Sequence, residues 1–161
     1  MLDISVMILL VVIFALVFDF INGFHDTANA IATTVSTRAM TPQKAIIASA
    51  VLNFCGALLS TGVAKTIGGD IVKSASMVNA NVLVAALIAA IVWNLVTWWY
   101  GIPSSSSHAL IGGLVGAVAA ASGFDALNAK GIETIVLSLV ISPIIALVTG
   151  YALMVVLLWI F

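Results

Sequence analysis

Long apolar runs make up most of the chain, and polar residues interrupt them at only a few places. Several runs approach twenty residues, the length that an α-helix needs to cross a hydrocarbon core of about 30 Å. The sequence shows no period-two alternation of apolar and polar residues, so we expect no strands. Only helices or closed barrels span a bilayer, which leaves helices. The pattern therefore predicts an all-α membrane protein of about four to five transmembrane helices, at residues 4–36, 45–64, 78–100, 109–122 and 134–161.

The first of these runs is unusually long. Its helical pattern starts at Ile4 and continues to Ser36, which exceeds what one straight span requires. Gly23 lies near the middle, and glycine lets a backbone leave helical geometry. We therefore expect a broken first helix, interrupted at residues 22–24. Discontinuous helices of this kind build binding sites near the middle of the membrane in transporters.

One face of this first helix carries polar side chains at spacings of three and four residues, which form a single stripe. Its members are Asp19, Asn22, Asp26, Asn29 and Thr33. Ionisable groups inside a membrane are costly and usually mark an ion or substrate path. Polar contacts between helices are the alternative, but two acids on one face favour a path for a cation or a proton. Asp26 is the residue that we expect at its centre.

A run of serines, Ser104–Ser107, precedes His108 and the short helix expected at 109–122. Serine is a favoured N-cap, and the free N–H groups and dipole of a helix start attract anions. An ordinary surface turn is the alternative, but this helix is short for a full span and fits a re-entrant hairpin. A hydrolase pair is disfavoured, because the side chains of the adjacent Ser107 and His108 diverge on a helix.

Composition agrees with a membrane protein. The chain has 161 residues, of which 63% are hydrophobic and 7% charged, whereas a soluble domain has about 25% charged residues. We expect a single multi-pass transmembrane domain over residues 1–161, located in the cell membrane. The net charge of −1 gives no reason to expect a nucleic-acid partner. Gly112 and Gly116 form a pair of small residues one turn apart, with Gly113 and Ala117 one step on, which predicts close helix packing.

Two motifs together resemble one known family. The segment Gly23-Phe24-His25-Asp26-Thr27-Ala28-Asn29 resembles the G-A-N-D-x-A-N signature of the inorganic phosphate transporter (PiT) family, and residues 101–109 resemble its serine-rich hairpin motif. The neighbouring residues look like the bacterial low-affinity branch, and the motif order matches the family's first, N-terminal half. The resemblance implies ion-coupled phosphate uptake by one half of an inverted-repeat fold, without enzymatic activity or a cofactor.

The resemblance also implies roles for individual residues. By this likeness Ser104, Ser105, Ser106, Ser107 and Asn29 would contact phosphate, and Asp26 and Asn29 would be ligands if the coupling ion is Na⁺. The polar stripe adds Thr33 to the phosphate contacts and Asp19 and Asn22 to the path of the coupled cation or proton, which His25 adjoins. The chain departs from the signature, because Phe24-His25 replaces Ala-Asn. An imidazole titrates near neutrality and can serve proton coupling, so Na⁺ and H⁺ both stay open.

Family members carry a second signature in a second half, which this sequence lacks. A site between inverted repeats needs both repeats. We therefore expect a second repeat unit as partner in the bilayer, either a second-half chain or an antiparallel copy of this chain, and hence an oligomer. The alternatives are a permease for sulfate or another tetrahedral oxyanion, a passive channel, and a non-transporting half-length membrane subunit.

Overall fold

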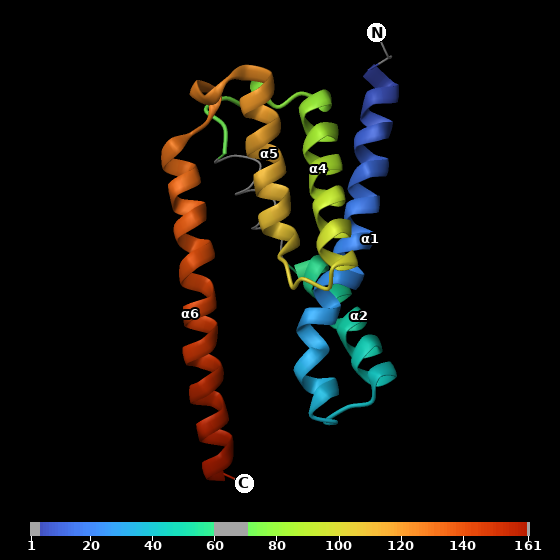
Figure 1. Cartoon of the computed structure of the whole chain (residues 1–161), viewed down its shortest axis with the longest axis vertical. Helices are drawn as coiled ribbons and strands as arrows, with labels where there is room; N and C mark the ends of the chain where they lie inside the picture. The colour runs from blue at the N-terminus through green and yellow to red at the C-terminus, as the bar shows by residue number, and fades with distance from the viewer. Residues whose placement is uncertain (1–3, 60–70, 161) are drawn as a thin grey trace. The chain divides into compact units, whose positions relative to one another are not determined.

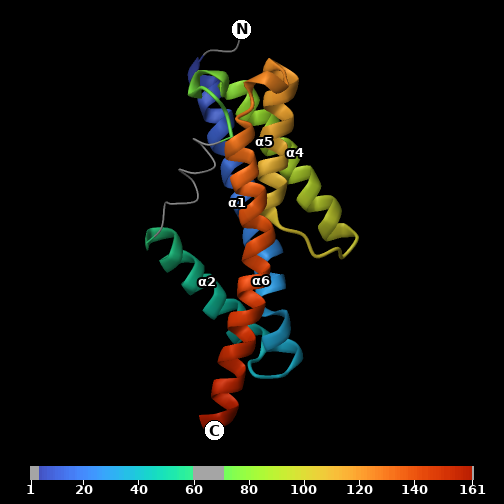
Figure 2. The ribbon, with the colours of Figure 1, turned by 90° about the vertical axis from the view of Figure 1, so that its left-hand side faces the viewer.

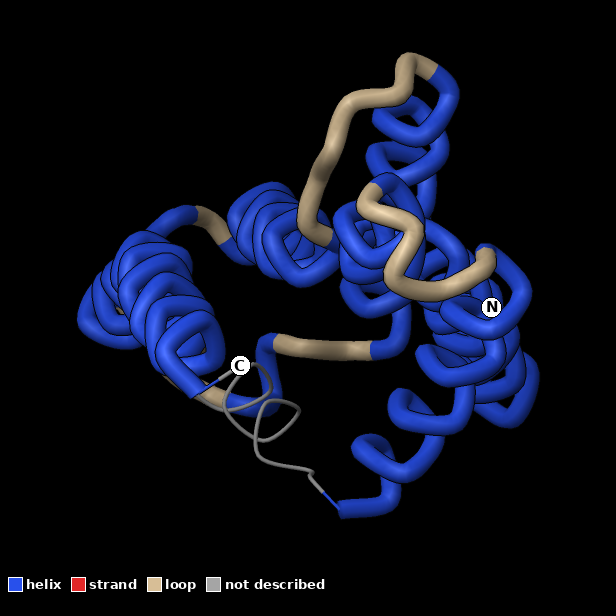
Figure 3. Tube along the Cα trace, turned by 90° about the horizontal axis from the view of Figure 1, so that it is seen from below, coloured by secondary structure: helices blue, strands red, loops and turns tan. Residues whose placement is uncertain are grey.

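Helices account for nearly all of the computed structural model, which describes residues 4–59 and 71–160. Within these ranges the helices are α1 (Ile4–Ser36), α2 (Pro42–Leu59), η1 (Ala75–Met77), α4 (Ala80–Trp99), α5 (Ser106–Ser122), η2 (Phe124–Ala126) and α6 (Ala129–Ile160). Loops connect them, and no strand occurs in the described part (Figure 3). Four helices (α1, α2, α4 and α6) are long and apolar enough to cross a membrane. The all-α prediction is therefore confirmed.

The chain divides into two compact units, Met1–Leu127 and Asn128–Phe161. In the first unit, α4 and α5 run antiparallel as a hairpin, and the N-terminal half of α1 lies along α4 (Figures 1 and 2). The C-terminal half of α1 continues past the α4–α5 loop and lies beside α2 (Figure 1). The predicted hairpin therefore exists, and its serine-rich loop reaches the middle of the long first helix.

An apolar cluster holds α1, α4 and α5 together. Its buried members come from all three helices: Phe18, Ile21, Leu87, Ala90, Ile91 and Ala109. Other large side chains of α1 remain exposed, among them Leu16 at 64% and Phe20 at 74%. Exposed apolar surface on this scale is unusual for a protein in water, but it is expected of helices that are apolar all round and lie in a membrane.

The first helix is continuous, so the expected break at residues 22–24 is wrong. Helical structure extends over all 33 residues of α1. Gly23 does not adopt a left-handed conformation, and the Asn22 side chain donates a hydrogen bond to Asp26 one turn later. The polar side chains thus find partners on the helix surface, and the backbone does not have to open to supply them. At about 1.5 Å per residue, α1 is about 50 Å long and exceeds one membrane thickness.

The short helix α5 begins at Ser106, three residues earlier than predicted. Ser105 is its N-cap, and the Ser105 Oγ accepts a hydrogen bond from the backbone N–H of His108 at 3.3 Å. This bond satisfies one of the free N–H groups of the first turn. The cap therefore extends the helix into the serine run and fixes where each serine points.

A glycine of the predicted small-residue segment, Gly113, allows α5 to approach α4 closely. A Cβ atom on Gly113 would lie 2.6 Å from the backbone oxygen of Ala86 on α4. Gly112 and Gly116 have no atom within 4 Å of the equivalent position. Close packing is confirmed, but Gly113 makes the contact, because the rotation of α5 about its axis turns that residue toward α4.

The remaining helices also follow the predicted spans. Helix α2 covers the first part of the expected span at 45–64, and residues 60–64 lie outside the described residues. In the second unit, α6 begins five residues earlier than predicted and includes Pro143. The Asn128 Oδ1 accepts a hydrogen bond from the backbone N–H of Gly131 at 3.3 Å, at the start of α6.

Candidate functional site

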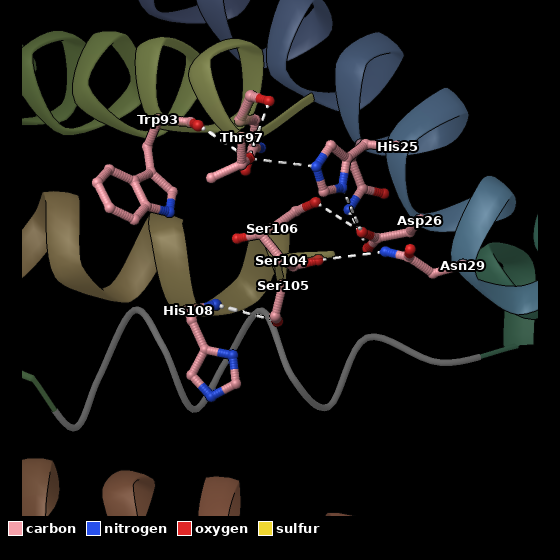
Figure 4. A network of polar contacts seen from close by, with 11 residues as sticks. His25, Asp26, Asn29, Trp93, Thr97, Ser104, Ser105, Ser106 and His108 are labelled. Carbon is pink, nitrogen blue, oxygen red and sulfur yellow. Dashed lines mark hydrogen bonds and ion pairs between the residues drawn. The ribbon is translucent and has the colours of Figure 1, made fainter. Parts of the chain in front are cut away.

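Asp26 is the centre of a group of polar side chains contributed by three helices (Figure 4). On α1 itself, the Asn22 Nδ2 donates a hydrogen bond to Asp26 Oδ2 at 2.8 Å. Residues four apart on a helix are neighbours on its surface. The predicted stripe is therefore real at this pair, and Asn22 occupies one of the two carboxylate oxygens.

The start of α5 makes two further contacts with α1. The Ser106 Oγ donates to Asp26 Oδ1 at 2.8 Å, and the Asn29 Nδ2 donates to the backbone carbonyl of Ser104 at 3.3 Å. Ser106 is fully buried. Hydrogen bonds to an ionised carboxylate are about twice as strong as those between neutral groups. The two polar segments predicted from the sequence are thus joined directly, and Ser106 is the serine that reaches the acid.

His25 connects Asp26 to α4. The His25 Nδ1 lies 3.4 Å from Asp26 Oδ1, and the His25 Nε2 lies 3.3 Å from Thr97 Oγ1. Both His25 and Thr97 are buried. The Thr97 hydroxyl also lies 3.0 Å and 3.1 Å from the backbone carbonyls of Trp93 and Asn94, which can accept its proton.

The arrangement around His25 can hold an imidazole in either charge state. A neutral ring donates from Nδ1 to Asp26 and accepts the Thr97 hydroxyl proton at Nε2. A cationic ring donates from both nitrogens, and the Thr97 hydroxyl then turns its proton to the carbonyl of Trp93 or Asn94. Both states use the same heavy-atom positions. The partners of His25 are therefore compatible with both forms of the ring.

Both departures from the family signature face α4. The ring of Phe24 packs edge to face on Trp98, with centroids 5.7 Å apart, and His25 contacts Thr97 in the same turn of α4. Aromatic pairs of this geometry are favourable beyond their buried area. The two substituted residues thus belong to one local contact between α1 and the end of α4.

The four serines differ in what their side chains do. Ser105 caps α5 and Ser106 binds Asp26. The hydroxyls of Ser104 and Ser107 form no hydrogen bond with other described residues, and Ser107 is exposed. Two of the four hydroxyls therefore have partners within the fold, and the other two have none among the described residues.

The two ends of the stripe do not join this group. Asp19 is exposed and lines a cavity of about 530 Å³ between α1 and α2, whose other polar members include Thr27 and Asn53. Thr33 is exposed one turn beyond Asn29, and its backbone carbonyl accepts hydrogen bonds from the Ser36 and Thr37 hydroxyls. Each lies about two turns from Asp26 along α1, which is too far to share its partners.

Sequence reasoning missed two members of the group, Thr97 and Asn94. Both are buried on α4, at the end of an apolar run. Their spacing of three residues places them on one face of a helix. Two polar residues one turn apart within such a run are the signal that could have predicted them, although only the packing of α1 against α4 shows that Thr97 meets His25.

A smaller cavity of about 210 Å³ lies beside this group. Its wall includes His25 and Asn29 on α1, Thr97 on α4 and residues 101–103 of the α4–α5 loop. The amide, imidazole and hydroxyl groups can donate hydrogen bonds to an oxyanion, and the adjacent Asp26 carboxylate can bind a cation or a proton. Among the described residues, no three His, Cys, Asp or Glu side chains cluster as transition-metal ligands would. The chemistry present suits a small anion together with a hard cation or a proton.

Comparisons with known proteins agree with this arrangement. A model of the phosphate transporter family matches residues 22–161. The chain is 61% identical to a probable low-affinity inorganic phosphate transporter of Bacillus subtilis over 149 residues, which are 92% of this chain and 45% of that protein. It is 50% identical to a protein of the same description from Streptomyces halstedii, covering 96% of this chain and 73% of the relative.

A solved structure is also similar. It is described as the sodium-dependent phosphate transporter, with a TM-score of 0.79 and 33% sequence identity, over 86% of this chain and 36% of that one. The chain thus spans less than half the length of the Bacillus subtilis relative and of this solved protein. With four candidate spans and a family match over residues 22–161, the chain is a multi-pass membrane protein that belongs to the phosphate transporter family, a family of transporters and not of enzymes.

Proposed function

We propose that this chain supplies one half of an ion-coupled inorganic phosphate transporter in the cell membrane. The observation that carries the proposal is the hydrogen bond between Ser106 and Asp26, which joins the start of a helix to an acid inside an apolar helix. The family and the descriptions of the relatives support phosphate as substrate. The chain's coverage of 45% of the Bacillus subtilis relative supports the role as one half.

Phosphate binds, in this proposal, at the α4–α5 loop. The hydroxyls of Ser104 and Ser107 and the N–H groups at the start of α5 are suitable donors, because a helix start favours anions. Asn29 lies against the same loop through its contact with Ser104. Ser105 and Ser106 position the loop, and Thr33 lies farther along α1, on the approach to the site.

Asp26 would couple phosphate binding to a second ion. Two like charges 4 Å apart repel by about 4 kcal/mol at an effective dielectric constant of 20, which weakens binding by about a thousandfold. Phosphate therefore binds well only when the carboxylate charge is balanced. A proton on His25 can supply the balance, and so can Na⁺ held by the oxygens of Asp26, Asn22 and Asn29.

In this proposal Asp19 attracts the coupled cation at some distance from the binding site. It lies two turns before Asp26 on α1, within a mostly apolar cavity. A carboxylate there attracts a cation before the cation reaches Asp26. The neighbour described as a sodium-dependent phosphate transporter supports Na⁺ as the ion, whereas the contact between His25 and Asp26 supports a proton.

Uptake of radiolabelled phosphate into proteoliposomes tests the proposal. The vesicles contain this chain alone, or this chain with the unmatched part of the Bacillus subtilis relative, and Na⁺ and pH gradients are applied separately. We expect gradient-driven uptake in at least one of these preparations and its loss in Asp26→Asn. The variant Asp125→Asn, which changes an exposed acid outside the site, is the matched control.

Several outcomes would contradict the proposal. Unchanged uptake in Asp26→Asn would remove the coupling role of that acid. Uptake that needs no gradient would favour a passive channel, and stronger inhibition by sulfate than by phosphate would favour a sulfate permease. No uptake in either preparation would favour a non-transporting subunit.

A further inference from the structure

All four buried polar side chains of the described residues lie where α1, α4 and α5 meet. They are His25, Asn94, Thr97 and Ser106. Hydrogen bonds connect three of them to Asp26, directly or through His25. Asn94 differs, because it is 0% exposed and neither its Oδ1 nor its Nδ2 has a hydrogen-bond partner within residues 4–59 and 71–160. Of these four side chains, which we call the polar layer, Asn94 alone lacks a hydrogen-bond partner among the described residues.

Packing alone gives no reason for an amide at this position. Ala90 and Ile91, about one turn earlier on the same buried face of α4, are apolar. A buried amide without partners weakens the folded packing, because it has lost water and gained nothing in exchange. Leucine has the same number of side-chain heavy atoms and would avoid this loss. Unsatisfied buried groups are rare in native proteins and usually have a functional explanation.

We propose that Asn94 binds a water molecule in a second arrangement of the hairpin, in which the start of α5 has moved away from α1 and α4. Water can accept a hydrogen bond from Nδ2 and donate one to Oδ1, whereas a cation satisfies only the oxygen. In the present packing the zero exposure of Asn94 excludes contact with a water-sized molecule. Movement of α5 opens the hydrogen bond between Ser106 and Asp26 and admits water to this layer.

The cavity of about 210 Å³ is the source of that water. Thr97 lines the cavity, lies one turn from Asn94 on α4 and donates toward its backbone carbonyl. Water in the cavity therefore lies about one helical turn from the Asn94 side chain. Because the unsatisfied amide is unfavourable only in the dry packing, Asn94 shifts the equilibrium toward the opened hairpin. This role concerns the conformation of the chain and holds whichever ions the site takes.

A buried cysteine reports the opening. In a Cys55→Ser background, Ala90→Cys places a thiol at a position that is 0% exposed, one turn from Asn94. Thiols react as hydrated thiolates, so labelling by a small methanethiosulfonate reagent in detergent micelles measures the access of water. We expect measurable labelling with Asn94 present and labelling at least tenfold slower in Asn94→Leu. The matched reporter Val118→Cys, also 0% exposed but three turns along α5, should not change.

The controls separate this proposal from a purely structural role. Unchanged labelling of Ala90→Cys in the Asn94→Leu background would overturn it, and so would equal slowing at Val118→Cys, which indicates general stabilisation. Asn94→Met is a second variant with a flexible apolar side chain. We expect both variants to fold with thermal midpoints at least equal to that of the unsubstituted chain. Failure of both to fold would show that packing requires the amide, and the proposal would be wrong.

Discussion

The substitution Gly113→Ala tests the packing that positions the site. A Cβ atom at this position would lie 2.6 Å from the backbone oxygen of Ala86, whereas ordinary contacts begin at 3.4 Å. The oxygen belongs to the α4 backbone and cannot rotate away, so α5 has to move by about 0.8 Å. Ser106 lies about two turns away on the same helix. If the full movement reached it, its 2.8 Å hydrogen bond to Asp26 would lengthen beyond 3.5 Å and be lost.

The energetic effect follows from two opposing terms. Overpacking costs about 1–3 kcal/mol, and replacement of glycine by alanine inside a helix gains about 1 kcal/mol. Gly113→Ala should therefore be neutral to destabilising by about 2 kcal/mol. Gly112→Ala and Gly116→Ala meet no atom within 4 Å and should be stabilising by up to about 1 kcal/mol. The difference between Gly113→Ala and these two controls is the overpacking term itself.

Unfolding of the purified chain in detergent micelles of increasing sodium dodecyl sulfate content measures this difference. Trp93, Trp98 and Trp99 lie on α4, so their fluorescence follows the loss of the hairpin. Equal midpoints for Gly113→Ala and Gly112→Ala would refute the close approach of α5 to α4. They would also remove the geometric reason for the position of Ser106 beside Asp26.

Two further predictions concern α1 and its partner on α4. Thr97→Val removes the hydroxyl that faces His25 Nε2 and should reduce ion-driven phosphate uptake about fivefold to tenfold, the value of one buried hydrogen bond. Thr97→Ser should retain uptake in the same proteoliposome assay, and equal loss in both variants would contradict the hydroxyl's role. Arg38, in the turn that follows α1, has a φ of 60°, which costs a non-glycine residue about 1 kcal/mol. Arg38→Gly should therefore raise the midpoint of unfolding in the detergent titration, and a lower midpoint would show that the arginine side chain stabilises the loop.

The polar stripe illustrates how far the site could be predicted. Its spacing correctly placed Asn22 and Asp26 together, because helix periodicity is a local property of the sequence. The same argument included Asp19 and Thr33, which the structure places outside the group around Asp26. Helix α1 is about 50 Å long, and the stripe from Asp19 to Thr33 extends along it farther than the width of one neighbouring helix or loop. Only the position of the α4–α5 loop decides which part of the stripe becomes a site.

Apolar runs and residue spacing alone determined that the chain is helical, where most spans lie and which polar residues share a face. These properties depend on neighbours within a few residues. The tertiary structure decided that α1 continues through Gly23, that Ser106 reaches Asp26, that His25 meets Thr97 and that Gly113 contacts α4. The contacts of Ser106, His25 and Gly113 depend on how one helix is rotated and shifted against another. Successive residues of a helix differ by about 100° of rotation and 1.5 Å of rise. A small rotation or shift of one helix against another therefore brings a different residue into contact.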